Sequence, residues 1–298
     1  MTTKISSVGL LSPGDMGHSV GKVLVHNGMP VHTCLAGRSE RSAQLASAAG
    51  LTVNASFEEL VQQVDLFLSI VPPARATGVA QQIADAVKTT GTTLIYLDCN
   101  AISPETTREV GRIVEASGVT FIDGGIIGAP PKVDGAVPRI YVSGPDADQA
   151  TILNNHGLDV RPIGDVIGHA SGVKMCYAAL TKGLTALGTE LMVAAEAMGL
   201  TGSLREEFEL SQSAMLEHLE KSVPGMPPKA YRWVGEMEEI AKTFDDVGLT
   251  PKMLLGAADM YTLVGQTPLA NETPETRTRG KTLQDVVEIL NEALPKGK

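Results

Sequence analysis

Basic residues are scarce in this chain of 298 residues, with 24 Lys and Arg against 34 Asp and Glu and a formal net charge of −10. The deficit is shared equally by residues 1–166 and 167–298. Sequence-independent binding of nucleic acids depends on Lys and Arg that neutralise phosphates, so this charge balance argues against it. Aromatic residues make up only 4% of the chain, which leaves few side chains on which single-stranded bases could stack. We therefore expect no nucleic-acid partner.

Long apolar runs and secretion features are also missing. No stretch approaches the 18 uninterrupted apolar residues of a transmembrane helix, and the N-terminus lacks the apolar core of a signal peptide. The three cysteines, Cys34, Cys99 and Cys176, lie far apart without metal-binding spacing, as expected for reduced thiols. Neither the cysteines nor the acidic residues form a recognisable metal motif. These absences predict a cytoplasmic protein with no membrane partner and no metal.

Short apolar runs alternate with amphipathic stretches through the first half of the chain. Such alternation predicts βαβ units and a mostly parallel sheet, that is, the α/β fold class. The expected strands are 5–11, 31–35, 52–53, 66–71, 94–98, 119–122 and 140–143. The expected helices between them are 16–27, 40–49, 76–87 and 104–117.

Strand-like runs stop near residues 160–167, and the remainder of the chain has helical periodicity. A helix over residues 169–199 would be roughly 45 Å long. Its apolar residues recur every three or four positions and are expected to form one buried stripe: Val173, Tyr177, Leu180, Leu184, Leu187, Leu191, Ala194 and Met198. A helix of this length can also bridge domains or form the core of a homodimer, which we expect here. Further helices are expected at 204–219, 231–247, 251–262 and 283–294.

The sharpest local motif follows the first expected strand. Gly14 and Gly17 stand where a dinucleotide fingerprint requires close backbone approach to a pyrophosphate and tight helix packing, while Ser12 replaces the first glycine. The turn opens a helix whose positive end can hold phosphate. The sequence thus predicts a Rossmann-type dinucleotide-binding domain over residues 1–166, followed by an all-helical domain over 167–298. The expected cofactor contacts in the turn are Ser12, Pro13, Gly14, Asp15, Met16 and Gly17.

The end of the second strand indicates which dinucleotide is bound. A 2′-hydroxyl requires an acidic residue about 20 positions after the turn, whereas a 2′-phosphate requires arginine. Arg38 and Ser39 occupy this place, Arg41 follows closely, and no acidic residue precedes Glu40. A guanidinium matches a phosphate through its planar fork of donors. We therefore expect NADP(H) in preference to NAD(H).

Four spaced motifs together resemble the β-hydroxyacid dehydrogenase family, which includes 6-phosphogluconate and 3-hydroxyisobutyrate dehydrogenases. They are the glycine turn with Met16, the segment Val71-Pro72-Pro73, the loop Asp98–Pro104, and Gly172-Val173-Lys174 at the start of the long helix. The resemblance implies hydride transfer between a nicotinamide cofactor and a small substrate. It also implies that Val71 and Pro72 lie at the nicotinamide and that Lys174 is catalytic.

The chain departs from the family where substrate is bound. Ile127 replaces a serine of the family's substrate loop, Ala178 replaces an asparagine after the catalytic lysine, and Gly235-Glu236 replace a Lys-Asp pair. The segment from Tyr231 to Ile240 is similar to a poorly characterised branch of the family with a divergent helical tail. The expected substrate contacts are Gly124, Gly125, Ile127, Arg232, Trp233 and Glu236.

The expected reaction interconverts a carbonyl and an alcohol, with Lys174 as the acid and base. Tyr177 lies three residues further along the same helix face and either orients the substrate oxygen or belongs to the apolar stripe. Asn100 either donates to the cofactor or substrate, or is a turn residue. Trp233 either contacts the substrate or has a structural role. Two alternatives stay open for the whole protein: an NADPH-dependent imine reductase, and a non-catalytic NADP(H) sensor or scaffold.

Overall fold

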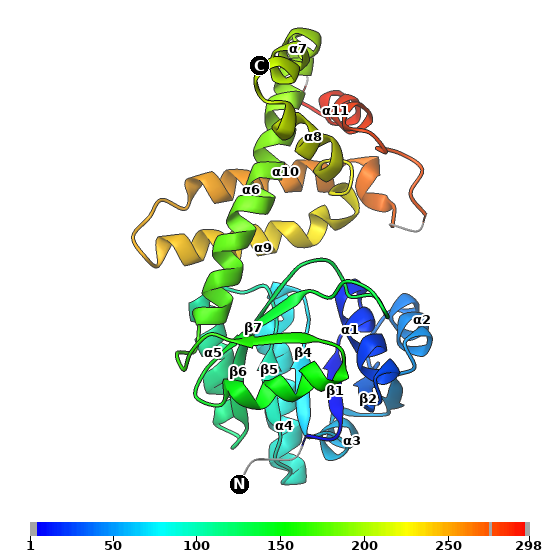
Figure 1. Cartoon of the computed structure of the whole chain (residues 1–298), viewed down its shortest axis with the longest axis vertical. Helices are drawn as coiled ribbons and strands as arrows, with labels where there is room; N and C mark the ends of the chain where they lie inside the picture. Colours follow the sequence, from blue (N-terminus) through cyan, green and yellow to red (C-terminus); the bar gives the residue numbers. More distant parts are fainter. Residues whose placement is uncertain (1–4, 274–275, 296–298) are drawn as a thin grey trace. The chain divides into compact units, whose positions relative to one another are not determined.

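The computed structural model describes residues 5–273 and 276–295. The chain divides into two compact units, Met1–Met175 and Cys176–Lys298. The long helix α6 (His169–Ala197) begins in the first unit and continues into the second (Figure 1). The domain boundary expected at 166/167 would assign all of α6 to the second domain, and it stays a prediction.

An eight-stranded sheet with the order β3-β2-β1-β4-β5-β6-β7-β8 forms the centre of the first unit. All neighbouring strands from β3 to β6 run parallel, β7 runs antiparallel to β6, and β8 is parallel to β7. The predicted α/β fold with a mostly parallel, Rossmann-type sheet is confirmed. The strands are β1 (Val8–Leu11), β2 (Val31–Cys34), β3 (Thr52–Asn54), β4 (Leu66–Ser69), β5 (Ile95–Asp98), β6 (Thr120–Ile127), β7 (Arg139–Ser143) and β8 (Asp159–Pro162).

Helices cover both faces of this sheet. Consecutive strand residues point to opposite sides, so strands that are apolar throughout have two faces to bury. Leu10 of β1 packs into one buried cluster with α1 and α2, whereas Leu11 packs into a second cluster with α3, α4 and α5. In the same way, Leu97 and Tyr96 of β5 belong to opposite clusters. The elements between the strands are α1 (Asp15–His26), α2 (Glu40–Ala48), α3 (Phe57–Gln62), η1 (Pro73–Arg75), α4 (Ala76–Thr90), α5 (Pro104–Glu115) and η2 (Ala147–His156).

The described part of the second unit is helical, as predicted, and α9 and α10 lie side by side within it (Figure 1). The single helix expected over 204–219 is wrong, because Gln212, at φ −140° and ψ 38°, interrupts it. The elements are α7 (Thr201–Ser211), α8 (Ser213–Ser222), η3 (Pro227–Lys229), α9 (Ala230–Asp245), α10 (Lys252–Gly265), η4 (Pro268–Asn271) and α11 (Leu283–Glu292). Within residues 5–273 and 276–295, no helix has the length and apolar character needed to cross a bilayer.

The apolar stripe of α6 does not lie in the core of the chain. Leu180, Leu187 and Met198 are 67%, 57% and 64% exposed, while the buried side of the helix carries Met192 and Val193. The prediction of a buried stripe is therefore wrong for these residues. Spacing of three and four shows that side chains share a helix face, but it does not show what covers that face. Exposed contiguous apolar surface of this kind is typical of an interaction site.

Candidate active site

The glycine turn after β1 is built by close backbone packing. The Gly14 N–H donates to the Ser12 carbonyl at 2.8 Å, and α1 begins at Asp15. A Cβ placed on Gly17 would lie 2.0 Å from the Ser12 carbonyl oxygen, so only glycine fits there without movement. A Cβ on Gly14 would meet no atom of residues 5–273 and 276–295 within 4 Å. The turn therefore has the open backbone and the helix N-terminus that a pyrophosphate requires.

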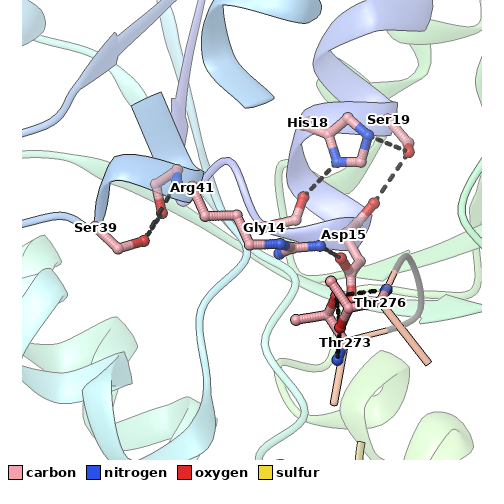
Figure 2. Close-up of polar contacts among 9 residues, drawn as sticks. Gly14, Asp15, His18, Ser19, Ser39, Arg41, Thr273 and Thr276 are labelled. Atoms are coloured by element: carbon pink, nitrogen blue, oxygen red, sulfur yellow. Dashed lines mark hydrogen bonds and ion pairs between the residues drawn. The ribbon is translucent and has the colours of Figure 1, made fainter. Parts of the chain in front are cut away.

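Side chains around this turn are held by local bonds, which Figure 2 shows. His18 Nδ1 lies 2.7 Å from the Gly14 carbonyl oxygen, and Ser19 Oγ donates to the Asp15 carbonyl at 3.0 Å. Arg41 Nη2 donates to Asp15 Oδ1 at 2.8 Å. Arg41 is thus engaged in an ion pair with the turn itself, which the sequence did not predict.

Arg38 lies at the carboxyl end of β2, next to the start of α2. Burial lowers the pKa of its guanidinium, and the neighbouring positive charge of Arg75 lowers that pKa further. Ser39 is the N-cap of α2, with its Oγ accepting from the Ser42 N–H at 3.3 Å. The partly buried Arg38 guanidinium at this edge fits a cofactor phosphate. The Ser39 hydroxyl, in contrast, already caps α2.

Asn100 is a positioning residue in this structure. Its Oδ1 accepts from the Val71 N–H at 2.7 Å, and its Nδ2 donates to Asp98 Oδ2 at 2.8 Å and to Ser69 Oγ at 3.0 Å. The side chain is 1% exposed. Both amide hydrogens are used within the protein, so the direct donation to cofactor or substrate expected for Asn100 is not what the geometry provides. Asn100 instead fixes the backbone that precedes Pro72, which is exposed.

Lys174 lies on the first turns of α6 with its ammonium at the carboxyl end of β5. Its Nζ donates to the carbonyl oxygens of Asn100 at 3.3 Å and Cys99 at 3.4 Å. The side chain is partly buried. The structure therefore brings together Lys174, Asn100 and the end of β4, three parts of the predicted site that are far apart in sequence.

Gly124 and Gly125 of β6 make room for this arrangement. A Cβ on Gly124 would lie 2.6 Å from the Asp98 carbonyl oxygen, and one on Gly125 would lie 2.6 Å from the Ala170 carbonyl oxygen. Both residues are buried, and Ile127 is only 5% exposed. The structure thus gives Gly124 and Gly125 a role in backbone packing under Lys174, while their expected contact with substrate stays a prediction, as does that of Ile127.

Asp123 anchors the N-terminus of α6, a role that sequence reasoning missed. Its carboxylate accepts from the N–H groups of Gly168 and Ala170 at 2.9 and 3.0 Å, and from Ser171 Oγ and Ser143 Oγ at 2.5 and 2.8 Å. A buried carboxylate with this many donors fixes the first turn of the helix and hence the position of Lys174. The available signal was an acidic residue directly after the expected strand 119–122, which the structure places inside the longer β6.

Burial raises the pKa of Asp98, at the end of β5, to about 7. The hydrogen bond from the Asn100 N–H and the charge of Lys174 lower this pKa, and the charge of Asp123 raises it. A carboxyl group that titrates near neutrality two residues before Asn100 is a feature found at functional sites.

The raised Asp98 pKa predicts a loss of stability as the pH rises. The pKa of Asp98 is about 7 in the folded state against a usual value of 3.8, so folding favours the protonated carboxyl group. The contribution is complete below about pH 4 and is lost by about pH 7, and it amounts to about 4 kcal/mol. Urea unfolding of wild type and Asp98→Asn at pH 5 and pH 8 checks this. From pH 5 to pH 8, the free energy of unfolding of Asp98→Asn should rise by about 2–3 kcal/mol relative to that of wild type. If the difference between the two proteins were the same at both pH values, the raised pKa of Asp98 would be contradicted.

The remaining predicted residues belong to the second unit. Tyr177 is 49% exposed on α6. Glu236 of α9 forms an ion pair with Lys182 of α6, and Trp233 packs edge-on against Tyr261 with ring centroids 5.2 Å apart. Lys182 Nζ lies 5.5 Å from the Trp233 ring centroid, within range of a cation–π interaction. Trp233 and Glu236 thus help to join α6, α9 and α10, while Arg232 is partly exposed next to them.

Comparisons with known proteins agree with the fold of the first unit. The family described as NAD binding domain of 6-phosphogluconate dehydrogenase matches residues 4–155, and a domain of unknown function (DUF1932) matches residues 195–264. The mitochondrial 3-hydroxyisobutyrate dehydrogenase of Drosophila melanogaster is 24% identical over 232 residues, which cover 75% of this chain and 69% of the relative.

Two solved structures show the same fold. Conserved protein MTH1747, of unknown function and described as structurally similar to 3-hydroxyacid dehydrogenases, is 29% identical with a TM-score of 0.64, over 87% of this chain and 97% of that protein. The 3-hydroxyisobutyrate dehydrogenase of Mycobacterium tuberculosis, solved with L-serine, is 19% identical with a TM-score of 0.68, over 96% and 99% of the two chains.

Proposed function

The chain belongs to the family described as NAD binding domain of 6-phosphogluconate dehydrogenase, and from this membership we propose that it is an NADP(H)-dependent oxidoreductase. Its proposed reaction interconverts a small carbonyl compound and the corresponding alcohol. The observation that carries the proposal is the position of Lys174, whose ammonium is held by the carbonyl oxygens of Cys99 and Asn100 at the carboxyl end of the sheet. Ligands of open α/β sheets bind at this edge.

The residues of the first unit fit a bound dinucleotide. The open backbone at Gly14 and the N-terminus of α1 would hold the pyrophosphate, and Arg38 would hold the 2′-phosphate. Val71, whose N–H is fixed by Asn100, and Pro72 would border the nicotinamide. The nicotinamide, when bound, supplies or accepts the hydride.

Side chains of the protein would transfer the proton. In the direction of reduction, Lys174 Nζ would donate a proton to the oxygen of the substrate carbonyl, and in oxidation it would take that proton back. The two backbone carbonyls that accept from Nζ keep the ammonium oriented. Asp123 and Gly125 help to position Lys174, since Asp123 anchors the start of α6 and Gly125 lets that helix approach β6.

Turnover with a panel of aldehydes, keto acids and imines tests the proposed reaction. We expect NADPH-dependent reduction of at least one aldehyde or keto acid and slower reduction of the imines. Turnover of imines alone would replace the proposed reaction by imine reduction. Binding of NADPH with no turnover on any substrate would indicate a sensor or scaffold protein.

We further propose that the chain forms a homodimer through the exposed stripe of α6. Apolar side chains such as Leu180 and Leu187 are more than half exposed on one face of this helix, and a second copy of the same face would bury them. Leu187→Glu is expected to convert the dimer to a monomer in analytical ultracentrifugation, since it places a charge in the apolar contact. Leu210→Glu, at a residue that is 85% exposed on α7, is the matched control. A wild-type chain that sediments as a monomer would refute the dimer.

A further inference from the structure

Two arginines follow strand ends at the carboxyl edge of the sheet, and within the described part of the chain neither has an acidic partner. Arg38 follows β2, and Arg75 closes the short helix η1 that follows β4. Burial lowers the pKa of the Arg38 guanidinium, and the positive charge of Arg75 lowers that pKa further. Among residues 5–273 and 276–295, neither guanidinium forms an ion pair or a side-chain hydrogen bond.

The sheet topology brings the segments that carry Arg38 and Arg75 to the same edge. Strands β2 and β4 lie on either side of β1 and run parallel to it, so their carboxyl ends are about 10 Å apart at one edge. The Arg75 backbone is fixed by its N–H bond to the Pro72 carbonyl at 2.9 Å and by the preceding prolines. Arg38 is partly buried and Arg75 is exposed, so the pair is open to solvent on the Arg75 side.

Like charges held close together destabilise each other unless an anion lies between them. The other arginine of this region, Arg41, is already paired with Asp15 at 2.8 Å. The ion pair with Arg41 therefore compensates the negative charge of Asp15. Among the described residues, the arginines of this region that have no ion pair are Arg38 and Arg75. A phosphate monoester dianion offers three acceptor oxygens, enough for both guanidinium forks.

We infer that Arg75 is a specificity residue of the cofactor site, which together with Arg38 forms a clamp for a phosphate monoester on the adenosine ribose. This assignment rests on the proposed function, because it requires that NADP(H) is the cofactor. It adds a residue from the β4 side of the site, where the sequence pointed only to residues that follow β2. Arg75 binds the phosphate and takes no direct part in the reaction at Lys174.

Calorimetric titration with NADPH and NADH tests the clamp on the full-length protein. For wild type we expect clearly tighter binding of NADPH. Arg75→Ala should weaken NADPH binding about tenfold and Arg38→Ala more than that, since each variant removes charge-assisted hydrogen bonds to the phosphate. NADH binding should change less than twofold in both variants. Arg75→Lys keeps the charge but not the fork and should retain part of the preference. Arg112→Ala on α5, at an exposed arginine paired with Glu105, is the control for net charge.

The possible failures of this experiment are distinguishable. Arg75→Ala that binds NADPH as wild type does, while Arg38→Ala loses it, overturns the role of Arg75 and leaves the proposed function intact. Equal losses for NADPH and NADH in Arg75→Ala also overturn it, because they assign Arg75 to the adenine or the shared ribose. A wild-type chain that binds NADH as tightly as NADPH overturns the proposed cofactor and the clamp together.

Discussion

Replacing Lys174 with Ala is expected to lower the turnover number by about 10²–10⁴-fold, the usual contribution of a positioned acid or base. The Kd for NADPH should stay within about twofold of wild type, because Lys174 Nζ donates to the carbonyl oxygens of Cys99 and Asn100, whereas the pyrophosphate is expected at the glycine turn. Steady-state kinetics on the best substrate of the panel, with calorimetric titration of NADPH, measures both quantities.

Two comparisons make the Lys174 result specific. Lys174→Arg keeps a positive charge but cannot release a proton near neutral pH, so it should be nearly as inactive as Lys174→Ala. Lys88→Ala removes an exposed lysine from α4 and should be fully active. Full activity of Lys174→Ala with unchanged pH dependence would remove Lys174 from the mechanism and with it the central observation of the proposed function.

The sheet could be predicted from the sequence because each strand carries its own signal. Runs such as Leu66–Ser69 are apolar on both faces, as buried parallel strands are, and the stretches between them have helical periodicity. The glycine turn was recognisable as a short motif at a strand end, whereas Lys174 was singled out by the resemblance of its segment to a known family.

Contacts between distant segments could not be predicted in this way. Gly124 and Gly125 were expected to touch substrate, but what they meet is the backbone of β5 and α6. Arg41 and Arg75 show the same limit. Arg41 lies near Arg38 in sequence but pairs with Asp15. Arg75 is 37 positions from Arg38, and the two follow strands at the same edge of the sheet because β2 and β4 flank β1. The partner of a side chain depends on strand order, which no local pattern contains.

Gly17→Ala is expected to destabilise the first unit and to abolish tight NADPH binding together. The added Cβ would lie 2.0 Å from the Ser12 carbonyl oxygen, which also accepts the Gly14 N–H bond. A backbone atom cannot rotate away as a side chain can, so the turn or the start of α1 must shift. Overpacking of this kind costs about 1–3 kcal/mol. Thermal unfolding should show a fall in Tm of about 2–4 °C for each kcal/mol.

Gly14→Ala, in the same turn, is the matched control because its effects should separate. A Cβ on Gly14 meets no atom of the described residues within 4 Å, and Gly14 has φ −86°, which alanine adopts without strain. The free energy of unfolding should therefore stay within about 0.5 kcal/mol of wild type. NADPH binding should still weaken, because the Cβ occupies the space through which the pyrophosphate approaches the backbone. If Gly14→Ala bound NADPH like wild type, the pyrophosphate would not lie on this turn; if Gly17→Ala were as stable as wild type, the close approach to Ser12 would not constrain it.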